Sequence, residues 1–164
     1  MNKHKIVGRN LLLANRLHEV FISGHWIANT NYKDQIESLN REDAVQKVES
    51  LNSIAALVFH INYYVEGMLN AFEKGKLNMH DKYSFDLPSM LSEEEWTKLK
   101  LTFLSNTVAF ANYVEQMEED RFDQPFFDEK YGTVQRNIEG VLEHSYYHLG
   151  QISLIRKLIG GKNA

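Results

Sequence analysis

Apolar residues recur along this chain at the spacing of helices. In one segment, from about Ser53 to Lys74, they alternate steps of four and three residues, at Ile54, Val58, Ile61, Val65, Met68 and Phe72. Such a row lies on one face of a helix and is typical of a helix packed nearly parallel to its neighbours. Gly75 follows the segment and is expected to end the helix, since glycine is favoured just beyond a helix C-terminus.

Three further segments have the same period. The first runs from about Ile6 to Ile22. Another begins after Ser92, which forms a capping-box pattern with Glu95, and its apolar row is Trp96, Leu99, Phe103, Asn106, Phe110, Tyr113 and Met117. The last runs from about Val134 to Ile159, with Thr133 as its cap and Gly160 and Gly161 as its stop.

Together these segments predict an all-α four-helix bundle. No run of alternating apolar residues is bounded by hairpin turns, so no strand is expected. Residues 23–52 and 118–132 are each long enough to run the ~30 Å length of a 20-residue helix. Parallel neighbours joined by crossovers are therefore expected, in an up-up-down-down order, with simple up-and-down topology as the alternative. A short helix is expected after Asn40.

Asn106 is a polar residue in an otherwise apolar row. A buried amide of this kind usually makes a polar contact that fixes the register of two helices, and that is our prediction. The alternative is a role near a functional site.

Composition indicates one domain that spans residues 1–164. The length is typical of a single domain, and 43% apolar with 24% charged residues is ordinary for a water-soluble chain. The net charge of −4 and the lack of any Lys/Arg cluster argue against a nucleic-acid partner. No apolar run is long enough to cross a membrane, and the run at 11–14 is too short for a signal peptide. With no cysteine either, we predict a cytoplasmic protein.

The predicted last helix carries polar residues at the spacing of an inward face: Asn137, Val141, His144, His148, Gln151, Ile155 and Leu158. Residues four apart leave a helix within ~40° of each other and ~6 Å apart, so His144 and His148 can bind one metal ion. His60 lies midway along another helix that should be buried. Three imidazoles from two helices leave a coordination position open, which is typical of catalytic metal sites.

The spacing alone leaves an alternative, namely three separate core histidines bonded to Asn, Tyr or backbone groups. Two other metal sites are excluded. A zincin peptidase needs His-Glu-x-x-His, whereas residues 144–148 read His-Ser-Tyr-Tyr-His. A ferritin-like di-iron site needs Glu-x-x-His motifs, and no histidine of the chain has Glu three residues before it.

Other residues are weaker candidates. Gln151, one turn after His148, is either a hydrogen-bond donor behind the site, a substrate contact or an amide that packs between helices. His25 would reach the site only if the first helix extended that far, and His80 is expected to be solvated in a loop. Four tyrosines are expected to be aromatic residues of the bundle, and the alternative is that one of them is a proton donor near a metal: Tyr63, Tyr64, Tyr146 and Tyr147.

These residues resemble the DinB-like superfamily. The likeness rests on a histidine midway along the second helix, and on a His-x-x-x-His pair followed by Leu-Gly-Gln-Ile on the last one. The segments that carry it are 52–69 and 131–157. The superfamily includes DNA-damage-inducible proteins of unknown activity, metal-dependent hydrolases and thiol S-transferases.

The resemblance implies an up-up-down-down bundle, often a homodimer, with zinc or nickel on His60, His144 and His148. We therefore predict a metal-dependent enzyme that acts on a small-molecule substrate, by hydrolysis or by transfer of a low-molecular-weight thiol. The alternatives are a non-enzymatic metal-binding or stress-related module and a helical interaction protein without metal. The sequence contains no obvious general base.

Overall fold

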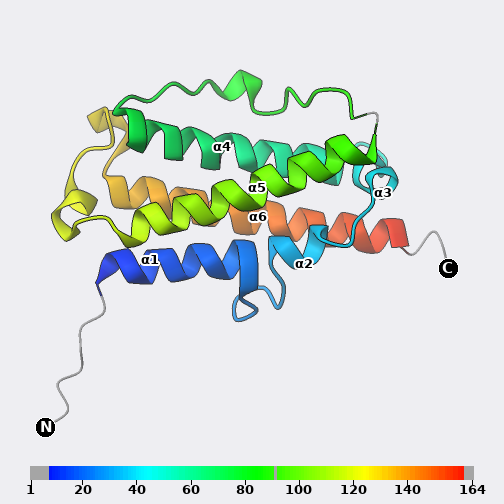
Figure 1. The fold of residues 1–164 in the computed structure, drawn as a ribbon, viewed down its shortest axis with the longest axis horizontal. Coiled ribbons are helices and arrows are strands. Elements are labelled where there is room, and N and C mark those ends of the chain that lie inside the picture. The colour runs from blue at the N-terminus through cyan, green and yellow to red at the C-terminus, as the bar shows by residue number, and fades with distance from the viewer. Residues whose placement is uncertain (1–7, 91, 161–164) are drawn as a thin grey trace, which may run out of the picture.

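The computed structural model describes residues 8–90 and 92–160, and in this part of the chain all regular elements are helices. The four longest helical elements form the bundle in Figure 1. They are α1 (Arg9–His18), which a π-helical turn η1 (Glu19–Ser23) continues, and α4 (Ile54–Lys74), α5 (Glu93–Glu115) and α6 (Val134–Gly160). The prediction of an all-α protein is confirmed.

Short helices occupy the connections. Two lie between η1 and α4, namely α2 (Tyr32–Ile36) and α3 (Arg41–Val45). Helix α3 starts directly after Asn40, as predicted. Three 3-10 turns lie in the other connections: η2 (Asp81–Tyr83), η3 (Glu119–Asp123) and η4 (Glu129–Tyr131).

Local sequence signals set the ends of the long helices. The Ser53 hydroxyl accepts from the Ala56 amide at the start of α4, and Gly75 ends that helix with φ of 69°. Ser92 and Glu95 form the predicted capping box of α5, and the Thr133 hydroxyl accepts from the Arg136 amide at the start of α6. The predicted start of the first helix at Ile6 and the stop residue Gly161 lie outside the described residues.

The helix directions differ from the up-up-down-down expectation. In Figure 1, α4 and α5 run in the same direction, opposite to α1 and α6, so the order is up-down-down-up. The reason lies in the connections. The 23–53 segment, which folds into α2 and α3, and the 116–133 segment, which contains two 3-10 turns, do not run back along the bundle, so the helices that each one joins run in opposite directions. Residues 75–90 instead run back along α4 to the start of α5, so α4 and α5 run in the same direction (Figure 1).

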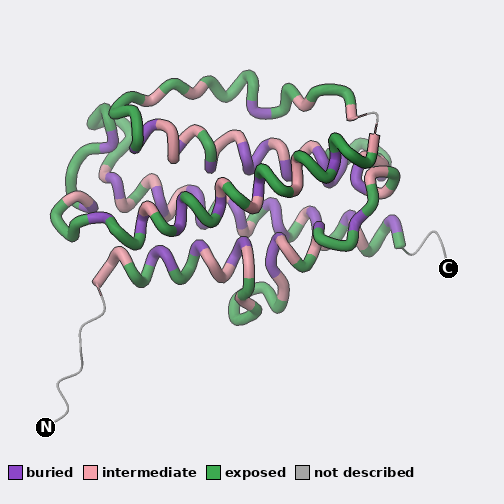
Figure 2. Tube along the Cα trace, in the orientation of Figure 1, coloured by how far each residue is buried: buried purple, intermediate pink, exposed green. Residues whose placement is uncertain are grey.

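Buried residues recur at intervals along the four long helices, and exposed residues lie between them (Figure 2). All six predicted seam residues of α4 are buried. On α5, the Asn106 amide donates to the Asn62 side chain at 3.0 Å, which confirms the predicted polar contact between two helices. No described helix has both the length and the apolar character needed to cross a membrane.

Candidate metal centre

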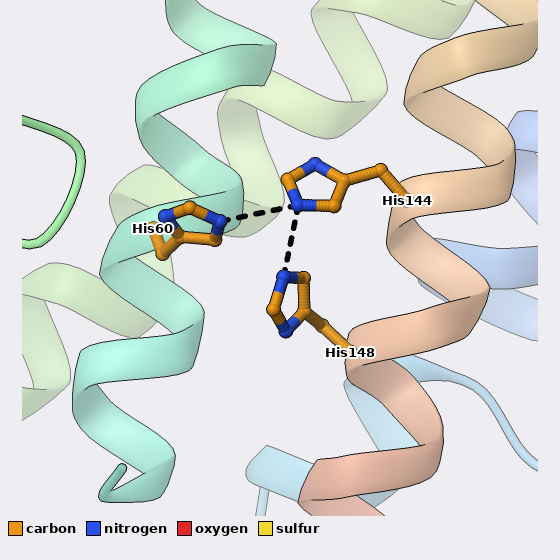
Figure 3. Close-up of side chains that lie close together, drawn as sticks. All are labelled: His60, His144 and His148. Carbon is orange, nitrogen blue, oxygen red and sulfur yellow. Dashed lines mark hydrogen bonds between the residues drawn. The ribbon is translucent and has the colours of Figure 1, made fainter. Parts of the chain in front are cut away.

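Three histidine side chains meet between α4 and α6 (Figure 3). The Nε2 atom of His144 lies 3.1 Å from that of His60 and 2.9 Å from that of His148. One ligand atom from each ring can be chosen so that all three lie within 4.8 Å of one another. The two adjacent helices of the bundle thus bring together residues that are 84 positions apart in the chain.

Hydrogen bonds on the far side of two rings fix which nitrogen carries the proton. His60 Nδ1 donates to the backbone carbonyl of Ser84 at 3.2 Å, and His148 Nδ1 donates to Gln151 Oε1 at 2.6 Å. A carbonyl oxygen only accepts, so both Nδ1 atoms are protonated. In the neutral rings the Nε2 atoms of His60 and His148 therefore present lone pairs to His144.

In this arrangement the three Nε2 atoms carry too few protons for each of them to take part in a hydrogen bond. If His144 carries its proton on Nε2, that proton can make a good hydrogen bond to the Nε2 of either His60 or His148. The Nε2 lone pair of the remaining histidine then faces a nitrogen without a hydrogen bond. If it carries the proton on Nδ1, three lone pairs face one another. Polar groups buried without a partner are costly, and His60 and His148 are only 5% and 6% exposed.

A divalent cation would satisfy all three nitrogens at once. Nitrogens ~2.0–2.1 Å from one ion, at angles between a right angle and tetrahedral, lie ~2.8–3.4 Å apart. The two Nε2 separations of 2.9 and 3.1 Å fall in this range. The polar groups behind His60 and His148 are also those expected behind metal-binding imidazoles, which usually donate their second N–H to an oxygen. The three histidines can therefore hold a metal ion.

The surroundings keep the rings neutral. Burial, with the neighbouring charges of His148 and His60, lowers the pKa of His144 to about 4. Burial also lowers the pKa of His60, helped by His148, and burial lowers that of His148. A neutral imidazole is the form that binds a metal, so the site is ready to bind one without first losing protons at neutral pH.

A loop covers the site from the α4 side. The ring of Phe85 stacks on His60 with a centroid distance of 3.9 Å and an interplanar angle of 15°, next to the carbonyl of Ser84 that His60 uses. Tyr64 lies edge-on to both His60 and His144, with ring centroids 5.1 Å away in each case. Its hydroxyl donates to Asp81 at 3.0 Å, and burial raises its pKa.

An open cavity of about 710 Å³ adjoins the histidines. His144 and Tyr64 form part of its wall, together with Asp81 and His80 from the loop. Cavities of ~300–1,000 Å³ are the usual size for small-molecule ligands. A ligand in this space would contact His144 directly.

The remaining sequence candidates lie in different places. Gln151 bonds His148 as an acceptor rather than a donor, and its Nε2 donates to the Tyr147 hydroxyl at 3.3 Å. His25 lies past the end of η1, exposed and paired with Asp34 at 2.6 Å, so it does not reach the site. Of the four tyrosines, Tyr64 lines the cavity next to His144, and Tyr147 packs on the ring of His148.

Ser84, Phe85 and Asp81 were missed by sequence reasoning. They lie in an irregular loop, where no periodicity indicates which side chain faces inward. The aromatic residues at 83 and 85, in a segment predicted to be a loop, are the only sequence hint that this loop packs against the bundle.

Comparison with known families gives a match to the DinB family over residues 14–164. That span contains all three histidines and the four longest helices except the first half of α1. No curated protein and no solved structure matches the chain.

The lowered pKa values predict acid destabilisation of the protein after its metal has been removed with a chelator. Between pH ~6.5 and ~4 the unfolded chain binds a proton at His144 and the folded chain does not, so the free energy of unfolding falls as the pH falls. Urea unfolding at a series of pH values should show this loss, and His144→Gln should reduce it.

His80→Gln is the matched control, because His80 is an exposed histidine in the same cavity wall. Identical pH profiles for the wild type and His144→Gln would contradict the neutral, buried state of the three rings.

Proposed function

The chain belongs to the DinB family, and we propose that it is a metal-dependent enzyme that holds one divalent ion on His60, His144 and His148. The observation that carries the proposal is the convergence of three Nε2 atoms that have too few hydrogens among them. A bundle that needed these histidines only for packing would give each one a partner of its own.

Zinc and nickel are the proposed ions. Imidazole nitrogen suits both, and the chain has no cysteine to favour a softer metal. The resemblance noted in the sequence points to the same two metals.

Three protein ligands leave room for a substrate, and the cavity beside His144 is where that substrate would lie. When bound, a divalent ion in such a site lowers the pKa of a water or thiol and polarises an electrophile. The ligand set thus fits both hydrolysis and the transfer of a low-molecular-weight thiol.

The chain's own residues would prepare this chemistry. Ser84 and Gln151 hold the rings of His60 and His148 with their Nε2 atoms toward the centre. Phe85 shields one face of His60 from water. The Tyr64 hydroxyl donates to the Asp81 carboxylate at 3.0 Å in the cavity wall, so this pair is our candidate for exchanging a proton with the substrate.

Turnover is tested by a screen of the metal-loaded protein. The substrates are thiol-plus-electrophile pairs and a panel of esters and amides, with His148→Ala alongside. We expect at least one class to be converted by the wild type and not by the variant. Equal rates in both would contradict the enzyme proposal. Bound metal without any turnover would favour the non-enzymatic metal-binding module instead.

Metal binding itself gives a separate prediction. Protein purified without chelator should contain about one zinc or nickel ion per chain by elemental analysis, and His144→Ala should contain little. Because a ligand of the folded state stabilises it, a chelator should lower the melting temperature of the wild type and leave that of the variant unchanged.

Two variants of Gln151 provide a graded control. Gln151→Leu removes the acceptor behind His148 and should weaken metal affinity by about 10–100-fold. Gln151→Glu keeps an acceptor at the same place and should retain the ion. A metal-free wild type, even after reloading and dialysis, would refute the site. The homodimeric state and the cytoplasmic location stay predictions.

A further inference from the structure

The outer side of α6 carries an exposed apolar row. Tyr147, Leu154 and Leu158 are exposed there, the first two at 64% and 54%. Together with Gln151, which is half-buried, they are spaced by four, three and four residues, and the buried seam of α4 has the same spacing. Such a row is typical of a helix that packs nearly parallel to another helix. On α6 it faces outward.

Two hollows flank this row, and Leu154 lines both of them. One, of about 260 Å³, lies towards Leu51. The other, of about 230 Å³, is formed with Ala28 of the 24–31 loop, which joins η1 to α2. That loop projects from the bundle (Figure 1) and presents Trp26, which is 89% exposed, and Ile27. The face thus combines ridges and hollows, which is the surface that helix packing requires.

Hydrogen bonds hold the 24–31 loop in place. The Ile27 amide donates to the Glu19 carboxylate at 3.0 Å, and the Asn31 side chain donates to the Gly24 carbonyl at 3.3 Å. A partner that covers Trp26 would therefore have little ordering of the loop to offset. Tryptophan is also among the residues that contribute most at protein–protein interfaces.

This side of α6 is symmetric about a point just after Gly150. Tyr147 and Leu154 lie on either side of that point, each about 5 Å from it along the helix axis. Glu143 lies about 11 Å away in one direction and Lys157 about 10 Å away in the other, and both are exposed. A second α6 in the opposite direction would therefore bring Glu143 beside Lys157 of the partner subunit. Charge and apolar surface are thus complementary to a copy of themselves.

The two charges also lie on one flank of the row. Both leave α6 on the side of Gly150, which is the side of the 24–31 loop. A twofold axis that reverses the helix direction brings each flank against the same flank of the other copy. Glu143 and Lys157 therefore meet, and the two loops lie beside each other. The neighbour of Glu143 within the chain, Arg136 at 3.0 Å, forms an exposed and hence weak ion pair with it.

Gly150 leaves room for close approach in the middle of this face. A Cβ atom added there would lie in open space, so no contact within the described chain requires a glycine. Glycine inside a helix is unfavourable relative to alanine, and one of its uses is to let another group approach the backbone closely. At this position the approaching group would be the second helix.

We propose that this face binds a second copy of the chain, with the two α6 helices antiparallel and crossing at Gly150. The homodimer expected from the sequence thereby acquires a surface and an orientation. Association covers Tyr147, which packs on the His148 ring, and Gln151, which accepts from His148, so it shields the candidate metal centre from one side. It does not depend on the ion, because the row contains none of the three histidines.

Sedimentation equilibrium of the full-length protein as purified tests the surface. The wild type should be dimeric at about 10 μM. Gly150→Arg should weaken the dimer by about 100-fold or more, because its side chain would occupy the crossing point. Its open surroundings should leave the helix intact, which circular dichroism checks. The matched control is Leu101→Arg, an equally exposed change on α5 that should stay within about twofold of the wild type.

Charge reversal tests the orientation. Glu143→Lys and Lys157→Glu each place like charges opposite one another twice in the dimer, so each should weaken it by about tenfold. The double variant restores opposite charges and should return to within about threefold of the wild type.

Three results would overturn the proposal. A wild type that stays monomeric up to about 100 μM would assign the face to some other partner. Dimerisation of Gly150→Arg as tight as that of the wild type, or an equal loss in Leu101→Arg, would place the contact on another surface. A double variant no tighter than the single ones would refute the antiparallel orientation.

Discussion

Three imidazole nitrogens face one another between α4 and α6 with at most one hydrogen among them, and the surrounding structure is arranged around that contact. Ser84 and Gln151 each take the Nδ1 proton of one ring, which turns the lone pairs inward. Burial keeps the rings neutral. A helical bundle could fill this space with leucine at lower cost, since an imidazole buried without its hydrogen bonds is penalised. The arrangement is favourable once a cation joins it, and the DinB family membership of the chain agrees with that explanation.

The topology of the bundle places the loop of residues 75–90 over this site. Because α4 and α5 run in the same direction, the chain must return along the bundle between them, and residues 75–90 do so in a mostly irregular loop next to α4 (Figure 1). That loop supplies Ser84, Phe85 and Asp81 to the site. Gly67 lets it pass close to the helix at Met79. A bundle with a short turn at this connection would leave His60 without its hydrogen-bond partner and its aromatic cover.

Periodic features were predictable from the sequence. The seam of α4, the capping box of α5 and the contact of Asn106 follow from local rules, and His144 and His148 share a helix face because they are four residues apart. The π-helical turn and the helix directions were not predictable, since they depend on which connection crosses the bundle. Asp81 and Phe85 were missed for a related reason. Single contacts made by an irregular loop leave no repeating signal in one sequence.

The position of the metal is the central claim, and anomalous diffraction from crystals of metal-loaded protein tests it most directly. Data collected on both sides of the absorption edge of the ion locate it without reference to the protein. The account predicts one peak ~2.0–2.1 Å from each of three nitrogens, the Nε2 atoms of His60, His144 and His148. A peak on other residues, or no peak between α4 and α6 in protein that holds one ion per chain, would contradict it.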